Sequence, residues 1–332
     1  MKRKWIRRVS WILLTPVLLF VILMILLYIP PVQNLLRREV TAYASKATGM
    51  QIQVERIDLR FPLNLLVRGV EVIQQPDTLL SLESLNVRVQ AWPLVKGKVE
   101  VDEVTLSQVA FNSANLIEGM KIKGVLGRFF LQSHGVDLSN ELAVINQTEL
   151  SDTHVQMLMN DTTTTPKDTT ASAPVNWKVD LHKLKLKNVS FSMQLPADSM
   201  RMAAHIGEAF INDAQADLKN QFYELKQFLL SGSSANYDTG AAKPGEGFDA
   251  SHIAVRDIRI GLDSLLYKSR DMNAVIREFS MNERSGLSIT SLTGRAFSND
   301  SIIRIPGIKL QTPHSEIDLS AQTYWELVNI PT

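Results

Sequence analysis

The residues best suited to acid–base or metal chemistry stand far apart in this chain. Its six histidines form neither an H-E-x-x-H motif nor a close pair that could hold a metal ion: they are His134, His154, His182, His205, His252 and His314. The absence of cysteine excludes disulfides, thiol catalysis and cysteine-bound metal centres. Walker loops, G-x-G-x-x-G fingerprints and G-x-S-x-G elbows are missing as well. We therefore expect no enzyme, no cofactor and no metal site, although a site assembled from distant residues would leave no such motif.

Charge gives no sign of a nucleic-acid partner. The 35 Lys and Arg residues nearly balance the 34 Asp and Glu residues, so no strong field attracts a phosphate backbone. Acidic neighbours such as Asp102 and Glu103 lie between apolar residues of an alternating stretch. We expect them on a solvated face, where they serve as surface charges rather than as a catalytic pair.

The N-terminus predicts a membrane anchor. A basic segment, 1–10, precedes a helical span at 11–30 that is long enough for one bilayer core and contains Trp11, Phe20 and Tyr28. A signal peptide would have a shorter apolar run and a small-residue cleavage site, and neither is present. The basic residues should hold the start of the chain in the cytoplasm and send the rest across the membrane.

The next segment, 32–49, has the spacing of an amphipathic helix. Its apolar residues recur three and four positions apart, and Gly49 is suited to end the helix. Three placements are compatible with this pattern. The helix lies on the membrane surface, plugs the first edge of a sheet, or packs on the following domain in the ordinary way.

From residue 50 onward the apolar period changes to two, with a repeated gap of three. The pattern apolar-x-apolar-x-x-apolar-x-apolar occurs at 52–59, 65–72, 80–87, 99–106, 179–186, 253–260 and 303–310. At about 100° per residue these positions would point all round a helix. On a strand, one inserted residue at the gap keeps the apolar side chains on one face, as a β-bulge does. At Pro306-Gly307 a tight turn is the simpler prediction.

The repeats predict a mainly β fold: an elongated, twisted, repetitive sheet with one apolar and one polar face. We divide it into a module at 50–159 and a second segment at 177–332. Between them, residues 160–176 are rich in Thr and Pro and have no hydrophobic period, which predicts a disordered loop. The pattern does not say whether the two segments share one sheet.

Several phrases carry a family resemblance. They are Val54-Glu55-Arg56-Ile57, Val67-Arg68-Gly69-Val70-Glu71-Val72, Val99-Glu100-Val101-Asp102-Glu103-Val104-Thr105-Leu106 and Val255-Arg256-Asp257-Ile258-Arg259-Ile260. With the preceding span and short helix, this order of parts resembles the N-terminal region of the AsmA-like superfamily, and within it the TamB family. TamB is the inner-membrane subunit of the translocation and assembly module.

The resemblance implies a long sheet curled into an apolar groove in the periplasm, anchored in a bacterial inner membrane by one span. It implies phospholipid acyl chains as cargo between the inner and outer membranes, and support of outer-membrane biogenesis with a TamA- or BamA-like barrel partner. The candidate groove residues are Ile52, Val54, Ile57, Leu59, Val70, Val72, Leu85, Val87, Val99, Val101, Val104, Leu106, Val109, Phe111, Leu181, Leu184, Leu186, Val189, Phe191, Val255, Ile258 and Ile260.

The chain departs from the TamB pattern in length. TamB proteins are much longer and have a characteristic C-terminal domain, so we expect a fragment that continues in a longer protein, or a short relative. Two other functions remain open. Exposed sheet edges could serve as a scaffold for outer-membrane protein strands, and a closed β-fold could have a structural role.

Overall fold

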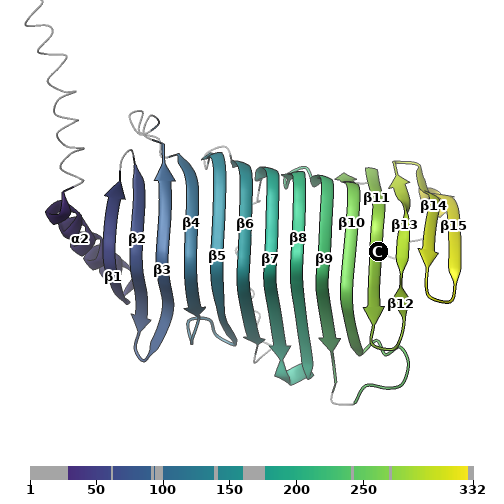
Figure 1. Ribbon diagram of the computed structural model, residues 1–332, viewed down its shortest axis with the longest axis horizontal. Helices are drawn as coiled ribbons and strands as arrows, with labels where there is room; N and C mark the ends of the chain where they lie inside the picture. The colour runs from purple at the N-terminus through teal and green to yellow at the C-terminus, as the bar shows by residue number, and fades with distance from the viewer. Residues whose placement is uncertain are drawn as a thin grey trace, which may run out of the picture.

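The computed structural model describes residues 29–60, 63–90, 93, 100–137, 141–159, 176–240, 243–268 and 271–327. Fifteen strands lie side by side in one open sheet, ordered as they occur in the chain (Figure 1). Only the short β12 leaves this order and pairs with β11 alone. The predicted mainly β, elongated sheet is therefore confirmed.

In the described part of the chain, the α-helix α2 (Pro30–Thr48) precedes the strands. Two short 3-10 helices, η1 (Pro196–Asp198) and η2 (Trp325–Leu327), interrupt or follow them. The strands are β1 (Gln51–Arg60), β2 (Asn64–Gln74), β3 (Asp77–Val89), β4 (Val101–Asn112), β5 (Met120–Asp137), β6 (Leu142–Met159), β7 (Lys178–Leu195), β8 (Met200–Asp217), β9 (Phe222–Asp238), β10 (His252–Lys268), β11 (Asp271–Glu283), β12 (Ser288–Ile289), β13 (Ser291–Ser298), β14 (Ile302–Gln311) and β15 (Glu316–Tyr324).

The helix α2 plugs the first edge of the sheet, which was one of its three predicted placements. The Gln33 side chain donates a 3.1 Å hydrogen bond to the carbonyl of Leu59, and Arg37 donates one of 2.9 Å to that of Val54. In return, the backbone N–H of Ile52 donates to the Ser45 hydroxyl at 3.1 Å. These bonds satisfy backbone groups that β1 would otherwise leave open for another strand.

The predicted membrane anchor lies outside the described residues, together with Trp11, Phe20, Tyr28 and the basic segment 1–10. Among the described residues, no helix combines the length and the apolar character needed to cross a bilayer.

The two predicted segments form one continuous sheet. They meet at β6 and β7, a parallel pair in which Leu142 lies opposite Lys178. The other described strand pairs are antiparallel. The predicted loop 160–176 lies outside the described residues except for Asn176, whose N–H donates to Glu141 at 3.0 Å.

The inserted residues of the sequence pattern form a row across the sheet. Between β1 and β2, Val54 pairs with Val70 and Arg56 with Arg68, so the intervening Glu55 and Gly69 face each other one to one. We call the positions that continue this line through β9 the slip row: Glu55, Gly69, Glu83, Gln108, Gly127, Asp152, Asn188, Gly207 and Gly232.

The slip row differs from the predicted bulges. A bulge sets two residues against one and shifts the register, whereas here each inserted residue meets another and the register continues unchanged. Left-handed backbone recurs along the row, at Gly69, Gln108, Asp152, Asn188 and Gly232. In the antiparallel part, left-handed and ordinary residues alternate from strand to strand. The parallel neighbours Asp152 and Asn188 are both left-handed and are joined by a 2.7 Å side-chain hydrogen bond.

The prediction of a tight turn at Pro306-Gly307 is wrong. The strand β14 runs through both residues, and its register against β15 shifts between Ile305 and Ile308. The lost N–H of the proline is tolerated because a bulge needs no ladder bond at that position. The Ser320 hydroxyl donates to the Pro306 carbonyl at 2.8 Å.

Glycine is required in the slip row where backbones approach closely. A Cβ built on Gly207 would lie 2.6 Å from the carbonyl oxygen of Gly232 and 2.9 Å from that of Ser231. Both contacts are with backbone atoms of β9, which cannot rotate away. We expect Gly207→Ala to lower the free energy of unfolding by about 2 kcal/mol.

Chemical denaturation of the purified chain measures this effect. Gly307→Ala is the matched control, because a Cβ there meets no atom within 4 Å. Equal stability of the two variants would show that the close approach at Gly207 is not a constraint.

Candidate functional site

The ladder collects the predicted apolar residues into rows that cross the sheet, because residues opposite each other in neighbouring strands share a face. The Ile57 row runs from β1 to β11 without a polar residue. Its members are Ile57, Val67, Leu85, Leu106, Phe129, Leu150, Leu186, Ala209, Leu230, Ile260 and Phe279.

A second row, the Leu59 row, lies beside it and contains one polar residue, Thr148. It comprises Leu59, Leu65, Val87, Val104, Leu131, Thr148, Leu184, Ile211, Phe228, Leu262 and Ile276.

Two more rows lie on the other side of the slip row. The Val54 row comprises Val54, Val70, Leu82, Val109, Leu126, Thr153, Val189 and Ile206. The Ile52 row comprises Ile52, Val72, Leu80, Phe111, Gly124, Val155, Phe191, Ala204, Ala235 and Val255.

Most predicted groove residues thus fall into these four rows. Of the rest, Val101 pairs with Val89 and Leu181 with Ile145, which prolongs the apolar strip toward the strand ends. Ile258 pairs with the polar Ser233. Val99 lies outside the described residues.

Sequence reasoning missed the row members of β5, β6, β8, β9 and β11. Phe129, Leu150, Ile211 and Phe228 belong to the rows, but their strands lack the full repeat. Gly127, Gly207 and Gly232 occupy the slip row in three of these strands. A search for period-two apolar runs broken by glycine would have found the row members of β5, β8 and β9, but not those of β6, where Asp152 occupies the slip row.

No described element packs over the apolar rows. Apart from α2 against β1, packing contacts between elements run from each strand to its ladder neighbours. Within the described part of the chain, no large side chain is fully buried, and row members such as Leu184 and Leu186 are half-buried. Side chains of neighbouring rows therefore cover one another laterally, while the surface of the rows that points away from the sheet is not covered by any described element.

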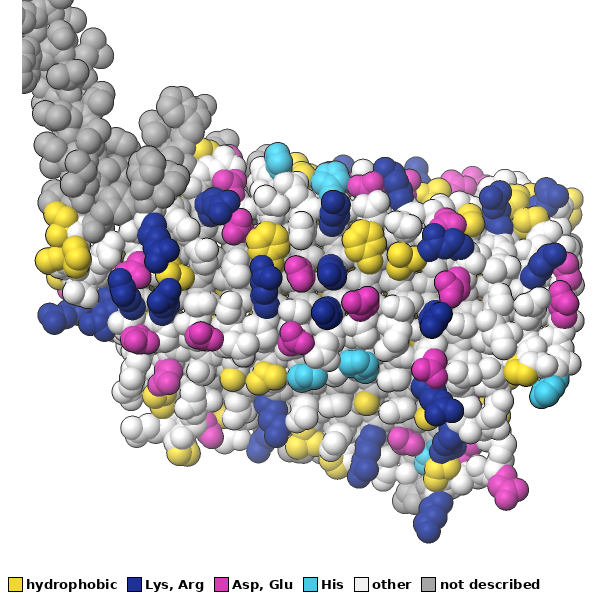
Figure 2. All heavy atoms as spheres, in the orientation of Figure 1, with side chains coloured by type: hydrophobic (Ala, Val, Ile, Leu, Met, Phe, Trp, Pro, Cys, Tyr) yellow, Lys and Arg dark blue, Asp and Glu magenta, His cyan; other side chains and the backbone are white. Residues whose placement is uncertain are grey.

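Most of the strand side chains on the other face are polar, although Phe130 lies opposite Glu149 and Phe210 opposite Lys185. In β7, Lys183, Lys185 and Lys187 alternate with the leucines of the rows and are exposed. Figure 2 shows a face of the molecule on which Lys, Arg, Asp and Glu side chains are spread over most of the strands.

Charges on neighbouring strands are paired across the ladder. The Asp213 carboxylate lies 3.0 Å from Nδ1 of His182 and 3.5 Å from the Lys226 ammonium. The hydrogen bond from His182 and the charge of Lys226 lower the pKa of Asp213. A similar 2.9 Å pair joins Arg277 to Asp263.

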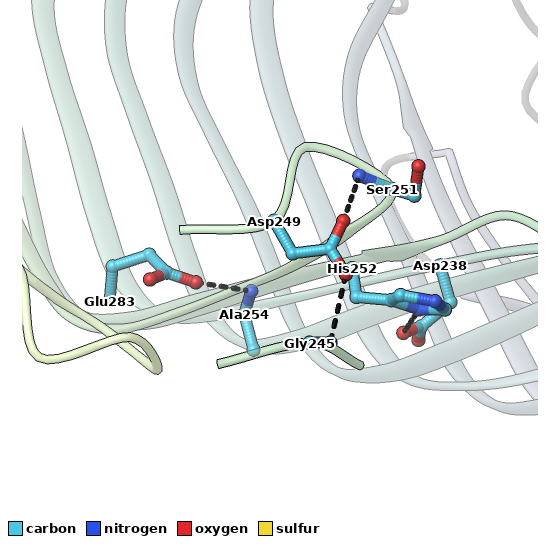
Figure 3. Close-up of polar contacts among 7 residues, drawn as sticks. All are labelled: Asp238, Gly245, Asp249, Ser251, His252, Ala254 and Glu283. Atoms are coloured by element: carbon cyan, nitrogen blue, oxygen red, sulfur yellow. Dashed lines mark hydrogen bonds and ion pairs between the residues drawn. The ribbon is translucent and has the colours of Figure 1, made fainter. Parts of the chain in front are cut away.

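The buried His252 is part of a loop anchor at the start of β10 (Figure 3). Its Nδ1 lies 3.2 Å from the Asp238 carboxylate. Asp249 accepts hydrogen bonds from the backbone N–H groups of Gly245 and Ser251, and these lower its pKa. The same residues hold the loop between β9 and β10, so we assign them a structural role. Within the described ranges, no group of His, Asp and Glu side chains could hold a metal ion.

Comparisons with protein-family models and with curated proteins find no match to this chain. Evidence for the function of the chain therefore comes from the geometry of its sheet.

The Glu283 carboxylate makes the stability of the sheet near the start of β10 depend on pH. Its carboxylate accepts hydrogen bonds from the backbone N–H of Ala254 at 3.2 Å and of Ser285 at 2.6 Å (Figure 3 shows the first). Hydrogen bonds from the side chain and N–H of Ser285 are the main cause of a pKa lowered to about 2, against an ordinary 4.5. A lowered pKa stabilises the fold above about pH 4.5, and this stabilisation is lost as the pH falls toward 2.

We expect Glu283→Gln to lower the protection factor of the Ala254 amide at pH 7 and to remove the loss of protection that the wild-type chain shows between pH 4.5 and 2. Hydrogen exchange followed by mass spectrometry measures both. Glu278→Gln, at an exposed position of the same strand, should keep the wild-type profile. An unchanged profile in Glu283→Gln would contradict the assignment.

Proposed function

We propose that this chain is a membrane-anchored periplasmic protein of the TamB and AsmA-like type, which carries phospholipid between the inner and outer membranes. The observation that supports it best is the set of four apolar rows, which cross the sheet with no described element over them. An enzyme has no comparable support, so the proposal assigns no catalysis, cofactor or metal.

The dimensions of the strip suit an acyl chain. At about 3.3 Å per residue, the strip from Ile52 to Leu59 is roughly 23 Å wide. One leaflet of a bilayer core is about 15 Å thick, so a tail can lie within the strip while its headgroup stays in water. At about 4.8 Å per strand, the longest rows run for roughly 50 Å along the sheet.

The chemistry of the rows suits a cargo that moves. Each methylene removed from water contributes about 0.8 kcal/mol, which holds a tail on the wall of Val, Ile, Leu and Phe side chains. These contacts are non-directional, so a tail can pass from one strand to the next without breaking a specific bond. The curled, groove-like form of the sheet is part of this proposal.

A second candidate function, a scaffold for outer-membrane protein strands, has support from one edge. The outer edge of β15 pairs with no described strand, and Ile317 and Leu319 are about half exposed. An incoming strand could continue the ladder there. The edge of β1 offers no such site because α2 covers it.

Photocrosslinking tests the lipid proposal. A photoreactive residue at Val101 or Leu184 should capture phospholipid in cells, because both belong to the apolar strip. The matched positions Glu100 and Lys185 are their chain neighbours, and we expect little lipid there. Equal capture from both members of a pair would remove the case for an apolar conduit.

A charge within a row should block transfer. We expect Leu186→Asp to reduce lipid captured at Leu184 about tenfold, because an ionised carboxylate cannot lie against an acyl chain without losing water. Lys187→Asp, one residue away on the polar side, should leave capture unchanged. Equal effects of the two variants would contradict passage along the Ile57 row.

A further inference from the structure

The helix α2 has its polar side against the sheet and its apolar side exposed, which reverses the usual order for a surface helix. The side facing β1 bears Gln33, Arg37 and Ser45, whose hydrogen bonds close the edge. The exposed apolar residues are Leu35 at 59%, Leu36 at 38%, Val40 at 46% and Tyr43 at 77%.

The two flanks of α2 match the two faces of the sheet. At about 100° per residue, Arg38 and Ala42 lie roughly 100° and 140° from Arg37 in one direction round the helix. These two residues line a pocket with Gln53 of β1 and Glu71 of β2, which belong to the polar face. Ile52 and Val54 of the apolar rows line it as well, and their backbone groups bond to α2 at the edge. No β2 residue of the apolar rows lines this pocket.

The apolar flank lies on the opposite side. Leu36, Val40 and Tyr43 fall roughly 100°, 60° and 120° from Arg37 in the other direction. The fourth exposed apolar residue, Leu35, falls roughly 160° from Arg37, on the side of the helix that points away from the sheet. Since the pocket fixes which flank meets the polar face, Leu36, Val40 and Tyr43 lie on the side of the apolar rows. The apolar surface of the sheet therefore continues past β1 onto α2.

We infer that this flank of α2 rests on a phospholipid bilayer and is the port through which acyl chains pass between the membrane and the first strands. The inference rests on the proposed function for the identity of the cargo. It adds the place of entry and assigns Leu36, Val40 and Tyr43 as the residues that an acyl chain crosses first.

A bilayer is the occupant that the chain itself favours. The sequence has no charged residue from Val9 to Leu36, so a stretch of bilayer-spanning length runs directly into α2 and ends on its apolar flank. A helix in this position has the composition of an interfacial helix, with an aromatic ring at Tyr43 and a basic residue, Arg38, on the other flank.

The first test places photoreactive residues on the two flanks of the full chain, reconstituted in vesicles of phosphatidylethanolamine and phosphatidylglycerol. We expect Tyr43 to capture at least about fivefold more lipid than Ala42, because only the apolar flank lies in the bilayer. Equal capture at both positions, or capture of a second protein chain at Tyr43, would overturn the inference.

The second test asks whether cargo passes over this flank. Val40→Asp should lower lipid capture at Leu184 about tenfold, whereas Ala42→Asp, which adds the same charge on the other flank, should not. Exchange of the Ile52 amide, which is bonded to Ser45, reports whether α2 still closes the edge in each variant. If Val40→Asp leaves lipid capture at Leu184 unchanged while α2 still closes the edge of β1, the proposed port is contradicted.

The outcomes separate the port from the conduit. Lipid at Leu184 without lipid at Tyr43 overturns the port and leaves the conduit. If lipid is captured at Tyr43 but not at Leu184, both the conduit and the port are contradicted, and α2 is then only a membrane contact.

Discussion

The structure depends on keeping an inserted residue in each strand matched by one in its neighbour. Side chains alternate between faces with a period of two, so an unmatched insertion would turn every later apolar residue toward water. Along the slip row, Glu55 meets Gly69 and Gly207 meets Gly232, and the ladder continues in register on both sides. This matching, together with the left-handed backbone that recurs along the slip row, keeps the Val54 and Ile57 rows on one face although two residues lie between them in each strand.

A sheet built in this way has no central core. Its elements contact their ladder neighbours, as the units of a solenoid do, so its stability is spread along the array rather than held in one cluster. Few apolar side chains are buried, among them Ile57, Leu82 and Ala209, and most row members are half-buried. The same arrangement that limits burial leaves a continuous apolar surface available to a ligand.

Much of this fold could be predicted from local patterns. The spacing of 32–49 predicted the helix, which spans Pro30–Thr48, and the repeated gap predicted inserted residues on strands. The pairing of insertions could not be predicted, because it depends on residues that are neighbours only in the ladder. The parallel pair β6 and β7 left no local signal either. Pro306-Gly307 was misjudged because a bulge tolerates both residues inside a strand.

The alternation of left-handed backbone along the slip row limits how such a sheet can lengthen. Antiparallel neighbours stay in register where a left-handed residue of the slip row lies opposite an ordinary one. The strands β9 and β10 both have a left-handed residue where the slip row crosses them, Gly232 and Asp257, and their register shifts there. The parallel neighbours Asp152 and Asn188 share the conformation without a shift. A sheet of this kind would therefore lengthen by duplication of whole hairpins, which preserves the alternation. A single added strand would have to run parallel to its neighbour, as β7 does, or its register would shift and its apolar residues would leave the rows.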